Sequence, residues 1–139
     1  MKFVPAGEII GEKHQVRTVR ITQNSQLPSG EYSFVDMYCS DPSCDCRKAM
    51  IQVLHNGVHV ATINYGWESP EFYKKWMGGD KEDNEFSGMS GASIDFSSPN
   101  YVSGKGILGL FKSLLNDTWV AKMKYHYKEV KDAVLRKSK

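Results

Sequence analysis

The sequence predicts an α+β fold, in which an antiparallel β-meander of about four or five strands is covered on one face by C-terminal helices. Three observations lead to this prediction. Runs rich in β-branched and aromatic residues fill the first half of the chain, and an Asn-Gly pair at 56–57 separates two of them. Near the C-terminus, apolar residues recur at helical spacing instead. The chain has 139 residues, of which 40% are hydrophobic and 24% charged, so we expect residues 1–139 to form a single domain.

The strands are predicted from local composition. A half-exposed strand is expected within residues 14–21, where β-branched and basic residues mix. Asn56-Gly57 suits the two central positions of a type I′ turn, and this turn makes the flanking strands antiparallel. The predicted meander therefore comprises 31–39, 46–54 and 58–65, with a further short strand at 92–96.

The helices are predicted from caps and periodicity. Ser69-Pro70 is typical of a helix start, because Ser caps backbone N–H groups and Pro tolerates the first helical position. Two more helices are expected, one that includes 107–115 and one from about 118 to 136. The second carries five residues spaced 4, 3, 4 and 3 apart, which therefore share one face: Trp119, Met123, His126, Val130 and Ala133.

The cysteines provide the strongest functional signal. Cys39, Cys44 and Cys46 are the only three in the chain and fall within eight residues. A disulfide would use two thiols and strand the third, whereas zinc accepts several sulfur ligands in a tetrahedron. The first ten residues also lack the apolar run of a secretory signal, so we expect a reducing, cytoplasmic location. Zn²⁺ is the predicted cofactor; unmetallated thiols and redox chemistry are the alternatives.

The predicted strands restrict the choice of a fourth ligand. His55 and His59 flank the Asn-Gly turn, about 30 Å along the strand from Cys46, and are too distant. His126 is preferred, because it lies on the apolar face of the last helix and that face is expected to cover the sheet. A backbone carbonyl is the alternative partner for His126. The remaining candidate ligands are water and the following side chains: His14, Asp36, Asp41, Asp45 and Glu68.

One acidic residue stands among aromatic ones. Tyr32, Phe34, Asp36 and Tyr38 alternate along a predicted strand and should share one face. We expect the aromatic residues to fill the core rather than to form a platform for stacking bases. Asp36 is either a functional carboxylate or, as we prefer, an edge residue paired with Arg47 or Lys48.

The predicted function follows from the metal site. Three thiolates make zinc a weak Lewis acid, so a structural role is favoured over catalysis. Residues 112–139 contain eight basic and three acidic residues, which makes the last helix a candidate contact surface. We therefore predict a zinc-stabilised module that interacts with a protein or nucleic acid and not with a membrane. The alternative is a metal-assisted hydrolase or thiol-redox enzyme that uses the same cysteines.

Overall fold

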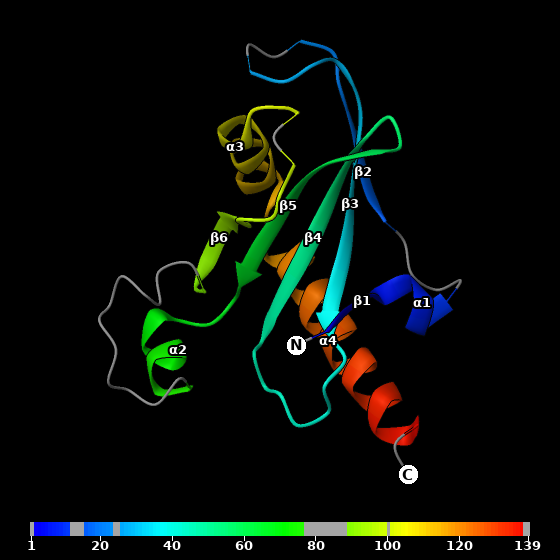
Figure 1. Ribbon diagram of the computed structural model, residues 1–139, viewed down its shortest axis with the longest axis vertical. Helices are drawn as coiled ribbons and strands as arrows, with labels where there is room; N and C mark the ends of the chain where they lie inside the picture. Colours follow the sequence, from blue (N-terminus) through cyan, green and yellow to red (C-terminus); the bar gives the residue numbers. More distant parts are fainter. Residues whose placement is uncertain (1, 12–15, 24–25, 77–88, 100, 138–139) are drawn as a thin grey trace.

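The computed structural model describes residues 2–11, 16–23, 26–76, 89–99 and 101–137 (Figure 1). Strands dominate the first half of the chain and helices the end, as the composition predicts. In chain order the elements are β1 (Phe3–Pro5), α1 (Ala6–Ile10), β2 (Arg17–Ile21), β3 (Gly30–Cys39), β4 (Lys48–His55), β5 (Val58–Gly66), α2 (Pro70–Trp76), β6 (Gly91–Ile94), α3 (Gly104–Leu114) and α4 (Asp117–Lys137).

The strands form one antiparallel sheet in the order β1-β3-β4-β5-β6, and β2 also pairs with β3. The β3-β4-β5 meander confirms the prediction. The described residues contain six strands rather than four or five, because a three-residue strand such as β1 has too little sequence to form a recognisable pattern. Both β1 and β2 pair with β3 on the edge opposite β4: Phe3 faces Cys39 and Arg17 faces Phe34.

The two C-terminal helices, α3 and α4, cover one face of this sheet. Along β3 the residues at even-numbered positions from 32 to 38 are buried, whereas those between them are half-buried. The same alternation in β4 places Ala49, Ile51 and Val53 on the covered side. Helix α4 packs on β3 and β4, and α3 packs on β5 and β6 (Figure 1). The predicted α+β architecture is therefore confirmed.

Local turn and cap chemistry agrees with the sequence. Asn56 and Gly57 have φ values of 49° and 86°, as a type I′ turn requires. The Asn56 side chain also accepts a hydrogen bond of 2.9 Å from the Glu31 backbone N–H. Ser69 caps α2 by accepting a 3.2 Å bond from the N–H of Phe72. These local signals were sufficient to predict both features.

The apolar face of α4 is confirmed. Trp119, Met123 and Val130 are buried, and His126 and Ala133 are half-buried on the same face. The ring of Trp119 meets those of Phe34 and Phe111 in edge-to-face contacts, with centroids 5.6 and 5.1 Å away. The aromatic residues of β3 thus belong to the core. No helix among the described residues has the length and apolar character needed to cross a membrane.

Gly66, at the end of β5, gives a test of this packing. A Cβ at Gly66 would lie 1.8 Å from the carbonyl oxygen of Met89 and 2.6 Å from the hydroxyl of Tyr73. We expect Gly66→Ala to lower the free energy of unfolding by about 3 kcal/mol, because backbone would have to move. Urea unfolding followed by circular dichroism measures this loss.

Gly109 supplies the matched control. A Cβ at this position within α3 would have no neighbour within 4 Å, so Gly109→Ala should raise the free energy of unfolding by about 0.5–1 kcal/mol. Equal stability of the two variants would contradict the packing around Gly66.

Candidate metal centre

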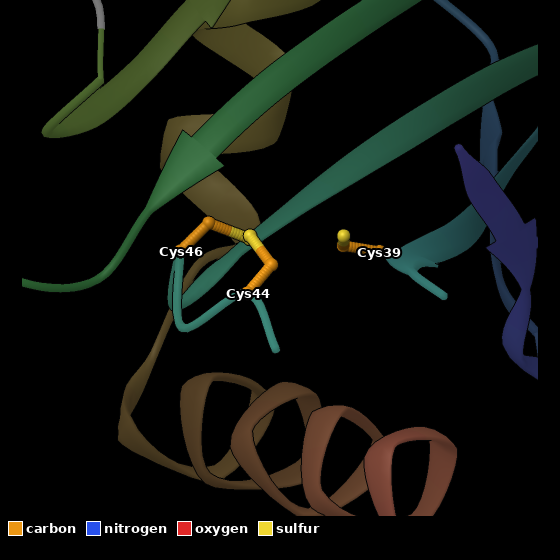
Figure 2. A group of neighbouring side chains, drawn as sticks. All are labelled: Cys39, Cys44 and Cys46. Atoms are coloured by element: carbon orange, nitrogen blue, oxygen red, sulfur yellow. The ribbon is translucent and has the colours of Figure 1, made fainter. Parts of the chain in front are cut away.

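The three cysteines meet where β3 leads into β4. Cys39 is the last residue of β3, and Cys44 and Cys46 lie in the loop before β4. Figure 2 shows the side chains of Cys44 and Cys46 directed toward each other, with Cys39 facing them from the strand end. All three are free, and their sulfur atoms lie within 4.8 Å of one another.

This spacing suits a tetrahedral metal ion. Sulfur atoms bound to zinc at about 2.3 Å are about 3.8 Å apart, so small side-chain rotations would close the set around one ion. Cys39 and Cys46 are buried and Cys44 is half-buried, which limits the access of water. A soft, sulfur-only donor set favours zinc over magnesium or calcium, which prefer oxygen ligands.

The loop is shaped by its own polar residues. One carboxylate oxygen of Asp41 accepts hydrogen bonds from the backbone N–H and the hydroxyl of Ser43, at 2.9 and 2.8 Å. The Cys44 N–H donates to the Asp41 carbonyl at 3.1 Å, and the Asp41 N–H donates to the Cys39 sulfur at 3.5 Å. An N–H aimed at sulfur stabilises negative charge on a thiolate and so supports metal binding.

Arg47 fixes the end of this loop. Its backbone has a φ of 49°, in the left-handed region that side chains other than Gly, Asn and Asp rarely adopt. The guanidinium binds both carboxylate oxygens of Asp45 at 2.9–3.1 Å and lies 4.5 Å from the ring centre of Phe72. These contacts offset the cost of the unusual backbone conformation.

Helix α4 holds the other side of the loop. The hydroxyl of Tyr127 lies 3.3 Å from the Arg47 backbone N–H, which donates to it, and 3.2 Å from a carboxylate oxygen of Asp45. One turn later, Lys131 donates to the Asp41 carbonyl at 2.6 Å. Neither helix residue was among the candidates predicted from the sequence, although their i, i+4 spacing places them on one face. The cysteine loop is thus fastened to the helix that covers the sheet.

The surroundings oppose free thiolates. Burial raises the pKa of the Cys44 thiol, and it raises the pKa of Cys46 to about 12, with the neighbouring cysteines adding to the effect. The thiols of Cys44 and Cys46 are therefore protonated near neutral pH in the absence of a cation. A divalent metal ion supplies the positive charge that would let them release their protons together.

His126 lies elsewhere. Its Nδ1 is 2.7 Å from a carboxylate oxygen of Asp36, and the hydroxyl of Tyr38 donates to the same oxygen at 2.7 Å. In the described part of the chain, the cluster of potential metal ligands consists of the three cysteine sulfurs and does not include His126. Asp36 and Tyr38 point toward α4. Cys39 is the next residue after Tyr38 along the strand, so its side chain starts from the opposite face of the sheet. Coordination by His126 therefore stays a prediction.

The other predicted partners can also be placed. The preferred prediction, that Asp36 pairs with Arg47 or Lys48, is wrong. Asp36 binds the side chains of Tyr38 and His126, and Arg47 binds Asp45 instead. His55 faces Tyr32, at the end of β3 opposite the cysteines, as the sequence predicts. His14 lies outside the described residues.

Comparisons with known proteins add no further guide to this site. No protein-family model, no curated protein and no solved structure matches the chain. The assignment of chemistry accordingly depends on the geometry and donor atoms described above.

Metal titration tests the site directly. We expect one Co²⁺ per chain to bind with sulfur-to-cobalt charge-transfer absorption, and Zn²⁺ to displace it. Replacing any of Cys39, Cys44 or Cys46 by Ser should weaken binding at least about 100-fold, because a thiolate ligand is lost. Ser43→Ala, which alters the same loop without removing a sulfur, is the control and should bind normally. Equal affinity in the cysteine variants would contradict the site.

Proposed function

We propose that the protein is a zinc-stabilised interaction module, in which Cys39, Cys44 and Cys46 bind one Zn²⁺. The observation that carries this proposal is the convergence of three thiols within 4.8 Å on a loop held from both sides. A bound ion would fasten the end of β3 to the start of β4. Because the loop also contacts α4, the ion would stabilise the packing of helix on sheet.

The donor set supports a structural role more than a catalytic one. Three thiolates donate much electron density and leave the ion a weak Lewis acid. The nearest carboxylates in the loop are already engaged: Asp41 with Ser43, and Asp45 with Arg47. A general base free to activate a metal-bound water is therefore not evident among these two. We propose that the fourth ligand of the ion is either water or a protein side chain, and that it takes no part in a reaction.

His126 remains the protein candidate for that fourth position. To bind the ion, its ring would have to leave the buried carboxylate of Asp36, and breaking a buried pair costs about 3–5 kcal/mol. Water has no such cost. The geometry therefore favours Cys39, Cys44 and Cys46 with water, and makes His126 the alternative.

Substitution of His126 separates these two possibilities. We expect His126→Ala to keep zinc affinity within about threefold and to lower the free energy of unfolding by about 3 kcal/mol, because Asp36 loses its partner. His126→Gln can still donate to Asp36 and should recover part of that stability. Competition with a chromogenic chelator and urea unfolding provide the two measurements. A loss of zinc affinity beyond about tenfold in both variants would instead support coordination by His126.

The proposed partner is a protein or nucleic acid, with α4 as the contact surface. Between residues 117 and 137 the helix carries six basic and three acidic residues. Its exposed bases give the solvent side a positive character: Lys122, Lys124, Lys128, Arg136 and Lys137. We propose a cytoplasmic location, since zinc sites of this kind need thiols that stay reduced.

A thiol-redox enzyme is less well supported. Redox cysteines react as thiolates and usually have a lowered pKa. Here burial raises the pKa of both Cys44 and Cys46. A metal-assisted hydrolase remains the second candidate, and it requires the water-filled fourth position to be reactive rather than inert.

Removal of the metal tests the proposed role. We expect a zinc-loaded sample to lose about 5 °C or more in Tm on treatment with a chelator, because metal-binding free energy contributes to folding free energy. Differential scanning fluorimetry measures the shift. The Cys44→Ser variant is the control and should respond little. An unchanged Tm for the loaded wild-type protein would exclude a stabilising role for the ion.

A further inference from the structure

A cavity of about 260 Å³ lies between the covered face of the sheet and the first half of α4. Its volume is near the lower end of the roughly 300–1,000 Å³ that small-molecule pockets occupy. The side chains of Phe34 and Trp119 form apolar walls. The cysteines do not line it. It is therefore a site separate from the candidate metal centre.

The polar side of this cavity holds the Asp36–His126 pair. Both side chains are largely buried, with exposed fractions of 9% and 15%. Tyr38 and His126 both bind Asp36, so two donors of the protein already stabilise the negative charge of its carboxylate. Because an ionised carboxylate can only accept hydrogen bonds, His126 donates to it through Nδ1, and this contact fixes the orientation of the ring.

Two cations border the same cavity. Arg17 lies with its guanidinium carbon 5.1 Å from the centre of the Trp119 ring, and Lys122 follows one turn later on α4. Among the residues that the structure describes, neither cation has an acidic partner. Two cations beside one hydrogen-bonded carboxylate give the lining of the cavity a net positive charge.

We propose that this cavity binds a small organic anion, a carboxylate or phosphate ester with a planar apolar body. The planar part would lie against Phe34 and Trp119, where aromatic walls give favourable contact area. The anionic group would pair with Arg17, whose planar guanidinium can bind two oxygens, and with Lys122. The positive charges of Arg17 and Lys122 make a cationic ligand unfavourable.

Binding of small probes tests the proposal in the full-length protein. The probes are benzoate and phenyl phosphate, with benzyl alcohol as the neutral counterpart, each titrated to about 20 mM because fragments of this size bind in the millimolar range. In ¹H-¹⁵N spectra we expect saturable shifts at the backbone of Val16–Thr18 and at the Trp119 indole. Both anions should bind at least about tenfold more tightly than benzyl alcohol.

Charge removal shows whether the cations hold the anion. Arg17→Met keeps an apolar contact with Trp119 but removes the charge, and should weaken the anions about tenfold without changing benzyl alcohol. Lys124→Met removes one positive charge from α4 outside the cavity, and should leave affinity unchanged. The proposal is overturned if neither anion shifts these resonances, if benzyl alcohol binds as tightly, or if the two variants lose affinity equally.

Discussion

The buried carboxylate of Asp36 is the constraint on which the arrangement of this protein depends. A carboxylate side chain at 9% exposure is costly to bury and must be hydrogen-bonded. Tyr38, two residues along the same strand, and His126 from α4 meet that requirement. Because His126 belongs to α4, this contact links the helix to β3, and together with the buried Trp119, Met123 and Val130 it sets the position and rotation of α4. Tyr127 and Lys131 are thereby directed to the cysteine loop, while Trp119 and Lys122 border the cavity.

Much of the fold could be predicted because its determinants are local. The Asn56-Gly57 turn needs only the backbone preference of two adjacent residues, and the apolar face of α4 needs only its spacing. Strand β1 could not be predicted in the same way. Its three residues are recruited by pairing with the end of β3, through contacts such as Phe3 with Cys39, and this information lies 36 positions away in the sequence.

The candidate site also has one part that depends on local sequence and one that depends on long-range contacts. Three cysteines within eight residues predict their own proximity, because a loop that short cannot separate them far. The partner of His126 is a long-range question, and periodicity places the residue on the correct face without identifying what it meets. The sequence did place Asp36 on the aromatic face of its strand. The sequence could not predict how α4 is positioned along β3. That position places His126 next to Asp36 rather than next to the sulfur atoms.

The contacts that hold the cysteine loop indicate which part of the protein a metal ion would stabilise. Arg47, Tyr127 and Lys131 already bind the loop through contacts that need no ion. The main hydrophobic cluster behind the six-stranded sheet also contains none of the three cysteines. Zinc would therefore reinforce an assembled fold rather than create one, unlike a zinc finger, whose core is too small to fold alone. The ion would mainly raise the free energy of local unfolding of residues 39–47. A loop of this length has little apolar packing of its own, and metal–thiolate bonds would hold it instead.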